Sequence, residues 1–185
     1  MYESPFMLFR VHSGLQSRFA SMPSITALLH TTDDALRLGR CLETLRPCQE
    51  VIVVDHGSRD ATLRIAREYG ARVVLGEDGV APVQYLQSAT HKWILCLDPR
   101  ESLTEGLEAT LFEWGWGAQA GAMPQPQACA FSVRLREQTG DGWVELPDPQ
   151  TRLVSREWNH WQGWLPGGEA SAVVLQGELL RFILP

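Results

Sequence analysis

The stretch SITALLHTTDDALRLGRCLETLRPCQEVIVVDHGSRDATLRIAREYGARVVL, residues 24–75, decides the fold class. It holds three short apolar runs, at 25–29, 51–54 and 72–75, separated by segments whose apolar residues recur at helical spacing. Strands that alternate with helices in this way form right-handed βαβ crossovers and therefore a parallel sheet. The stretch predicts a doubly wound α/β architecture.

Downstream of this stretch the pattern changes. A short helix is predicted at 82–89, a fourth strand at 93–97 and a longer helix at 104–114, where Ser102 and Glu105 have the spacing of a capping box. Segments typical of strands then follow without intervening helices, at 128–136, 142–146, 150–155 and 172–184. We therefore predict a Rossmann-type, mostly parallel sheet flanked by helices, with a short antiparallel C-terminal addition.

The length of 185 residues fits one globular domain. Residues 1–22 show no sustained periodicity, so we expect a loose N-terminal extension, followed by a single domain over 23–185. Within that domain we expect two halves, at 23–114 and 128–185. Residues 115–127, rich in Gly, Ala, Pro and Gln, are the expected connection between them.

Composition narrows the function classes. The formal net charge of -6 argues against a nucleic-acid-binding protein, because neutralising phosphates requires clustered Lys and Arg. The four cysteines form no CxxC pair and are interpreted as reduced thiols. No apolar run reaches the length of a membrane span, and residues 1–22 lack the apolar core of a secretory signal, which predicts a cytoplasmic location.

Polar and acidic residues follow the predicted strands. The segment 30–34, HTTDD, follows the first strand, Asp55 the second and Asp98 the fourth. Because ligands of open parallel sheets bind beyond the carboxyl ends of the strands, these residues are expected at one rim, where a divalent cation or a nucleotide would relieve carboxylate repulsion. The alternative is that Asp55 and Asp60 cap the next helix and Asp98 ends its strand.

The sequence resembles glycosyltransferase family 2, and especially its lipopolysaccharide core branch. The resemblance lies in 24–74, in ATHKWILCLDPRESLT at 89–104, and more loosely in PDPQTRLVSRE at 147–157 and LQGELLRFILP at 175–185. It implies the GT-A fold and transfer of a sugar, with inversion, from a nucleoside diphosphate donor. The implied acceptor is a saccharide or a lipid-linked molecule, as in the synthesis of cell-envelope polysaccharide. By the same resemblance, 23–114 is the expected nucleotide-binding half and 128–185 the expected acceptor-side half.

The same resemblance implies roles for individual residues. Asp55 matches the aspartate that holds the base, and Thr31 and Asp34 match the loop that lines the base and ribose. Asp98 matches the first aspartate of the metal-binding DxD motif, and Glu101 matches the acidic residue that closes the DADE signature. A Mn²⁺ or Mg²⁺ ion at this motif would stabilise the departing diphosphate.

The sequence departs from the family pattern at the DxD motif. Pro99 and Arg100 occupy its second and third positions, which predicts weak metal binding or none. Arg100 is expected to contact the diphosphate directly, the alternative being a surface arginine without such a role.

Two further family elements are missing. Pro82 and Val83 replace an Arg-Asn pair, and the His-Glu element that supplies a candidate base falls at 164–166 and is absent. Glu169, a few residues on, is the substitute that we predict as the general base. The losses equally suit a catalytically inactive relative that binds a nucleotide or a partner protein.

The segment WNHWQGW at 158–164 has two interpretations. Its aromatic rings suit the apolar faces of sugars, so it is a candidate acceptor loop or a site of peripheral membrane contact. The alternative is a hydrophobic layer that covers the sheet. A third activity, nucleotidyl transfer on a similar fold, is disfavoured because HTTDD offers no glycine-rich phosphate loop.

Overall fold

The computed structural model describes residues 24–117 and 129–183. The extension predicted at 1–22 and most of the connection predicted at 115–127 lie outside the described residues. No helix in the described ranges combines the length and apolar character needed to cross a membrane.

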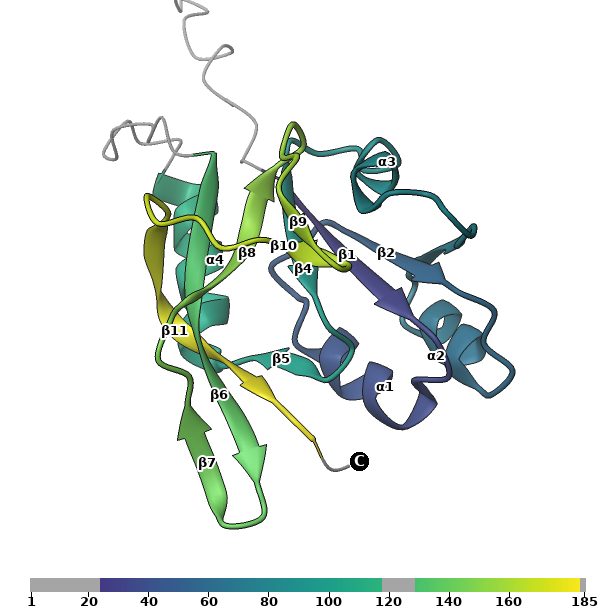
Figure 1. The fold of residues 1–185 in the computed structure, drawn as a ribbon, viewed down its shortest axis with the longest axis horizontal. Coiled ribbons are helices and arrows are strands. Elements are labelled where there is room, and N and C mark those ends of the chain that lie inside the picture. The colour runs from purple at the N-terminus through teal and green to yellow at the C-terminus, as the bar shows by residue number, and fades with distance from the viewer. Residues whose placement is uncertain (1–23, 118–128, 184–185) are drawn as a thin grey trace, which may run out of the picture.

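The N-terminal half forms the predicted parallel sheet, in the strand order β3-β2-β1-β4 (Figure 1). Buried apolar strands alternate with amphipathic helices here, as the periodicity predicted. Its elements are β1 (Ile25–Thr31), α1 (Ala35–Glu43), β2 (Glu50–Asp55), α2 (Thr62–Glu68), β3 (Arg72–Leu75), α3 (Pro82–Leu86) and β4 (Trp93–Leu97).

The C-terminal half extends the same sheet edge to edge, in the order β4-β8-β6-β11-β5. Strand β8 runs antiparallel to both β4 and β6, while β11 runs parallel to β6 and antiparallel to β5. Its elements are β5 (Glu101–Leu103), α4 (Glu105–Gly117), β6 (Ala130–Thr139), β7 (Gly142–Glu145), β8 (Gln150–Ser155), β9 (Trp161–Gln162), β10 (Leu165–Pro166) and β11 (Val173–Arg181). The predicted fold class is confirmed, with β5 and the β9–β10 hairpin as elements that the periodicity did not predict.

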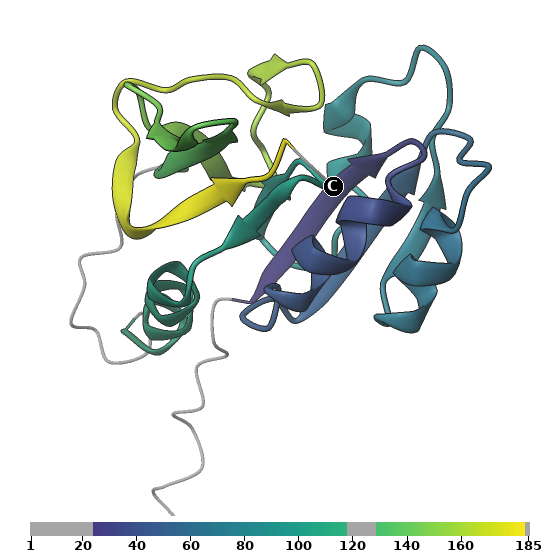
Figure 2. The ribbon, with the colours of Figure 1, turned by 90° about the horizontal axis from the view of Figure 1, so that it is seen from below.

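The sheet buries one apolar cluster on each face. Helices α1, α2 and α4 pack against one face through side chains such as Leu38, Ala66 and Leu107. Helix α3 and the segment around the β9–β10 hairpin cover the other face, through Leu86 and Trp158 (Figure 2). Because both faces are covered, the open space for a ligand lies at the carboxyl ends of the strands.

Side-chain oxygens accept free amides at the starts of two helices. The amide of Ala35, at the start of α1, donates to Asp60 Oδ2 at 3.0 Å, across from the neighbouring loop. At α4, Thr104 Oγ1 accepts the amide of Leu107 at 3.3 Å, whereas Ser102 lies within β5. The capping box predicted from Ser102 is wrong, because β5 extends the chain through that position.

Candidate functional site

A cleft of about 330 Å³ lies beyond the carboxyl ends of β1, β2 and β4. This volume is at the small end of the range for ligand sites. One wall is charged and the other is aromatic. The lining residues are His30, Thr31, Thr32, Asp34, Arg37, His56, Asp98, Pro99, Arg100, Trp164 and Ile183.

The charged wall is built around an ion pair within one turn. Arg100 donates from Nε to Asp98 Oδ1 and from Nη2 to Asp98 Oδ2, both at 2.8 Å. Burial alone would raise the pKa of Asp98, but these hydrogen bonds and the positive charge hold it below the usual value. Both carboxylate oxygens of the predicted metal ligand are therefore already engaged by a guanidinium.

Glu101, the second predicted metal ligand, is fully buried and does not line the cleft. Its Oε1 accepts Arg152 Nη2 at 2.9 Å and Arg181 Nη2 at 2.7 Å, and its Oε2 accepts Arg152 Nε at 3.0 Å. The amide of Asp98 donates to the same Oε2 at 3.2 Å. We revise the prediction for Glu101, because a carboxylate saturated by two guanidinium groups holds the turn at 98–101 in place and offers no lone pair to a metal.

Asp34 and Arg37 contribute a second acid and base to the charged wall. The guanidinium Nη1 of Arg37 lies 3.6 Å from Asp34 Oδ1, a long ion pair, while Asp34 Oδ2 accepts the amide of Thr32 at 3.0 Å. Burial and the nearby charge of Asp98 raise the pKa of Asp34. Among the described residues, Arg37 Nε is buried and has no hydrogen-bond partner, so this wall holds an unused donor.

Thr31 and Asp55 form the floor beside the charged wall. Thr31 Oγ1 lies 3.4 Å from Asp55 Oδ1, and Asp55 Oδ2 accepts the amides of Gly57 and Ser58. Thr31 lines the cleft, whereas Asp55 is buried behind it. Among the described residues, only the long bond from Thr31 engages Asp55 Oδ1, so that oxygen retains acceptor capacity.

Hydrogen bonds join the loops that follow β1 and β2. Asp33 Oδ1 accepts the amides of Arg59 and Asp60 at 2.6 and 3.2 Å, and the amide of Asp33 donates to Ser58 Oγ. Asp33 has a φ of 54°, a left-handed conformation that Asp tolerates better than most residues. These contacts fix the segment that covers Asp55.

The aromatic wall consists of His30, His56 and Trp164. His30 Nδ1 lies 2.9 Å from His56 Nε2, and the Trp164 ring packs 4.5 Å from the ring centre of each histidine. Burial and the neighbouring His56 lower the pKa of His30 to about 3, so this ring is neutral at physiological pH. The cleft therefore offers flat aromatic rings, including the neutral His30, beside its ionic wall.

The two interpretations of the 158–164 segment each describe part of it. Trp158 is buried and Trp161 packs beside it in the core, as the hydrophobic-layer interpretation expected. Trp164, at the turn of the β9–β10 hairpin, is 41% exposed and lines the cleft. Of these three tryptophans, one is therefore placed to meet a ligand.

Glu169, the predicted base, lies on the loop between β10 and β11 and does not line the cleft. Its Oε1 accepts the amide and the hydroxyl of Ser171, at 3.0 and 2.7 Å. Hydrogen bonds from Ser171 lower the pKa of Glu169. A general base must lie within hydrogen-bond reach of the acceptor, so Glu169 needs an acceptor that extends beyond the cleft.

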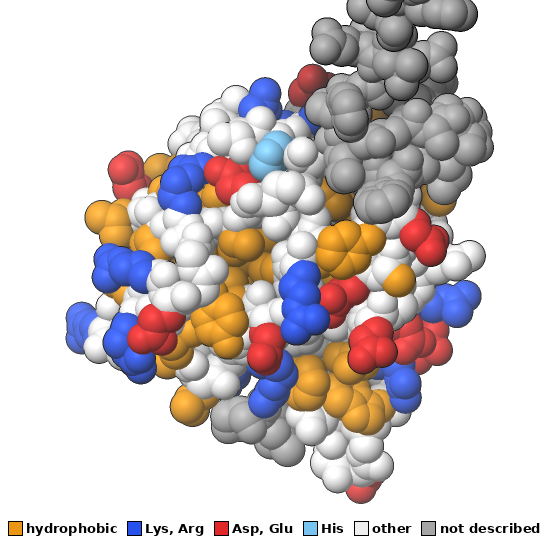
Figure 3. Space-filling model, turned by 180° about the vertical axis from the view of Figure 1, so that it is seen from behind, with side chains coloured by type: hydrophobic (Ala, Val, Ile, Leu, Met, Phe, Trp, Pro, Cys, Tyr) orange, Lys and Arg blue, Asp and Glu red, His pale blue; other side chains and the backbone are white. Residues whose placement is uncertain are grey.

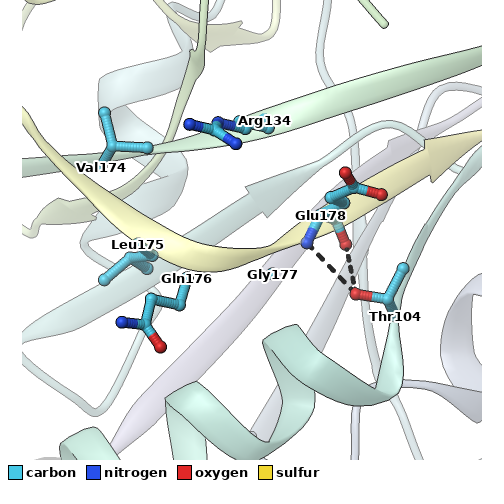
Figure 4. A pocket seen from close by; sticks show the side chains of 7 residues that line it. All are labelled: Thr104, Arg134, Val174, Leu175, Gln176, Gly177 and Glu178. Carbon is cyan, nitrogen blue, oxygen red and sulfur yellow. Dashed lines mark hydrogen bonds between the residues drawn. The ribbon is translucent and has the colours of Figure 1, made fainter. Parts of the chain in front are cut away.

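A second hollow lies where β11 bulges between α4 and β6 (Figure 4). Thr104 Oγ1 bonds both the amide and the carbonyl of Glu178 there. The hollow has a volume of about 520 Å³, and none of its lining residues lines the cleft at the strand ends. On the face seen in Figure 3, apolar side chains lie scattered among charged ones.

Comparison with known proteins agrees with this geometry. The family model described as glycosyl transferase family 2 matches residues 28–126. The chain belongs to glycosyl transferase family 2.

A TPR repeat-containing protein of Synechococcus elongatus is 37% identical over 139 residues, 72% of this chain and 31% of that protein. An uncharacterized glycosyltransferase of Rickettsia felis is 33% identical over 91 residues, 47% of this chain and 32% of that protein. The chain thus spans about a third of the length of these relatives.

Solved structures share the fold of this chain. Glucosyl-3-phosphoglycerate synthase from Mycobacterium tuberculosis, in complex with Mn²⁺, UDP-glucose and phosphoglyceric acid, aligns with a TM-score of 0.50. The sequences are 17% identical, and the alignment covers 76% of this chain and 59% of that one. The same enzyme with phosphoglyceric acid alone gives the same score. The GT-A-like fold predicted for this family 2 chain is confirmed.

From the sequence, we assigned no role to several residues that line the cleft. Arg37 and His56 were missed because one sits inside a helix pattern and the other in a polar turn. Ile183 was missed because only the pairing of β11 with β5 brings the C-terminal segment to the turn at 98–101. The amide of Phe182, which donates to the carbonyl of Arg100 at 2.9 Å, fixes that approach.

Proposed function

We propose that this chain binds a nucleoside diphosphate sugar and transfers the sugar, with inversion, to a saccharide or lipid-linked acceptor. The observation that carries the proposal is the cleft at the strand ends, with guanidinium groups on one wall and flat rings on the other. A nucleotide sugar presents the matching pair of features, a diphosphate and ring-shaped groups. Membership of glycosyl transferase family 2 supports the reaction class.

Within this proposal, some predicted site residues keep their expected role in donor binding and others take a new one. Thr31 and Asp34 line the cleft at the position proposed for base and ribose, and Asp55 supports Thr31 from behind. Arg100 faces the diphosphate, and Asp98 anchors Arg100. Trp164 offers its outer face to a sugar ring.

The proposed divalent cation has a weak basis in the residues present. Asp98 is paired with Arg100, and Glu101 is saturated by two arginines. Within residues 24–117 and 129–183, no group of three or more His, Cys, Asp or Glu side chains is arranged to hold a metal ion. These residues do not fit the oxygen-rich shell that Mn²⁺ or Mg²⁺ requires.

The proposal also includes a role in cell-envelope polysaccharide synthesis, membership of the lipopolysaccharide core branch, and a cytoplasmic location at the inner face of the membrane. It keeps Glu169 as the base and a single domain over 23–185. The rival is a catalytically inactive family member that binds a nucleotide or a partner protein. The ion pair that closes the DxD position and the remote Glu169 favour the rival, whereas the open cleft favours the transferase.

Calorimetric titration of the full chain with UDP, GDP and their sugar derivatives tests the proposal. We expect saturable binding of at least one nucleotide. Trp164→Ala should weaken binding of the sugar nucleotide about 10-fold or more and leave binding of the nucleotide without sugar unchanged. Trp143→Ala is the matched control, because Trp143 packs on Phe182 and does not line the cleft. Binding without release of nucleoside diphosphate, over a panel of saccharide and lipid-linked acceptors, would favour the inactive relative.

A further inference from the structure

The charged wall of the cleft has no excess of negative charge. Its ionic side chains are two acids, Asp34 and Asp98, and two bases, Arg37 and Arg100. A site that recruits a divalent cation needs an excess of carboxylate charge and free oxygen lone pairs. Here each acid already lies beside a guanidinium, at 3.6 Å for Asp34 and 2.8 Å for Asp98.

Both guanidinium groups keep donors for a further ligand. Arg100 donates from Nε and Nη2 to Asp98. In the described structure its Nη1 has no hydrogen-bond partner, and the Arg100 side chain is 42% exposed. Arg37 lines the cleft with a side chain that is 33% exposed, and its only ion pair among the described residues is the long one with Asp34, at 3.6 Å. The exposed part of its guanidinium can therefore donate to an anion in the cleft.

The two arginines come from elements that hold them rigidly. Arg37 lies in the first turn of α1, whose neighbour Leu38 is fully buried. The bidentate contact with Asp98 fixes the plane of the Arg100 guanidinium, and the buried Glu101 holds the amide of Asp98. A preorganised planar fork suits a phosphate group better than a flexible charge does.

We infer that Arg37 and Arg100 together bind the donor diphosphate in the place of a divalent cation, so that donor binding is independent of metal. Asp98 then acts as a positioning residue that orients Arg100. This inference rests on the proposed function, because the diphosphate belongs to the donor proposed above. It adds Arg37 as a binding residue and removes the need for the cation.

The first test is titration of the full chain with UDP and with inorganic pyrophosphate, in EDTA and in Mn²⁺. The expected dissociation constants agree within about twofold between the two conditions. Arg37→Gln and Arg100→Gln each weaken binding about 10- to 100-fold, the range for charge-assisted hydrogen bonds. Arg64→Gln, which breaks the exposed pair with Glu68 outside the cleft, is the matched control and leaves binding unchanged.

The second test restores the acidic motif. Arg100→Asp removes the guanidinium and releases Asp98, so we expect UDP binding to disappear in EDTA and to return with Mn²⁺. Circular dichroism confirms that each variant is folded, and Arg37→Lys and Arg100→Lys retain the charge where a Gln variant does not fold. Binding of UDP by the unaltered chain only in the presence of Mn²⁺ would overturn the inference.

The probes also separate this inference from the proposed function. Pyrophosphate binding in EDTA without binding of UDP, GDP or a sugar nucleotide would retain the arginine pair and defeat the nucleotide-sugar proposal. Nucleotide binding that both arginine variants leave unchanged would defeat the arginine pair alone. No binding of any probe under either condition would defeat both.

Discussion

Asp98 and Glu101 are three residues apart, yet the structure surrounds them in opposite ways. Glu101 is fully buried and shared by Arg152 and Arg181, while Asp98 lines the cleft and forms its ion pair with Arg100. Removing one partner of a buried pair leaves an uncompensated charge, whereas an exposed pair contributes little. The comparison shows that one residue of the turn is buried among arginines while the other faces the cleft.

The largest effect is expected at the buried carboxylate. Glu101→Gln leaves Arg152, itself 2% exposed, without its counter-charge, so unfolding free energy should fall by about 3–5 kcal/mol. Urea denaturation followed by circular dichroism measures it. A loss near that of an exposed ion pair would break the comparison, because Glu101 would then be no more structural than Asp98.

The next effect concerns the strand that brings Arg181 to Glu101. Gly177 in β11 has a φ of 91°, and a Cβ there would lie 2.4 Å from the backbone nitrogen of Leu107 in α4. Gly177→Ala should therefore lower unfolding free energy by about 1–3 kcal/mol. Thermal unfolding measures it, with Gly140→Ala, which meets no atom within 4 Å, as the control. Equal melting temperatures for the two variants would contradict the close approach of β11 and α4.

A smaller effect on stability is expected at the open carboxylate. Asp98→Asn should lower unfolding free energy by about 1 kcal/mol or less, because water screens the exposed part of the pair. The folded-state pKa of Asp98 lies below its ordinary value of 3.8, so its contribution is present above that pH and is lost as the pH falls through the depressed pKa. Comparing unfolding of both chains between pH 3 and pH 7 measures it. A difference that grew as the pH fell would have the wrong sign.

The smallest effect on stability is expected at a third carboxylate. Among the described residues, the Glu169 side chain hydrogen-bonds Ser171, on a loop outside the cleft, so Glu169→Gln should leave stability and donor binding unchanged. If Glu169 is the base, transfer falls about 100- to 10,000-fold in the same variant. Release of nucleoside diphosphate from a sugar donor in the presence of acceptor measures it. Unchanged transfer would remove Glu169 from the mechanism.

The sequence predicted the N-terminal half closely, because local periodicity encodes it. Strands β3 and β4 have the predicted bounds, and the end of β1 together with the loops after β1 and β4 supplies lining residues such as Thr31, Asp34 and Arg100. The different roles of Asp98 and Glu101 could not be predicted from local periodicity. Glu101 resembled a metal ligand by its place in a motif, and its two arginines lie 51 and 80 residues away along the chain.

By itself, the sequence determined the parallel α/β core, the family and the rim on which polar residues gather. Those properties follow from patterns of neighbouring residues, because strand and helix periods act over a few positions. Only the tertiary structure decided which carboxylates are already neutralised, that Arg37 faces the cleft, and that Trp164 and Ile183 close it. Those properties depend on side chains distant in sequence, and the charge and burial of a site are sums over all the neighbours that folding brings together.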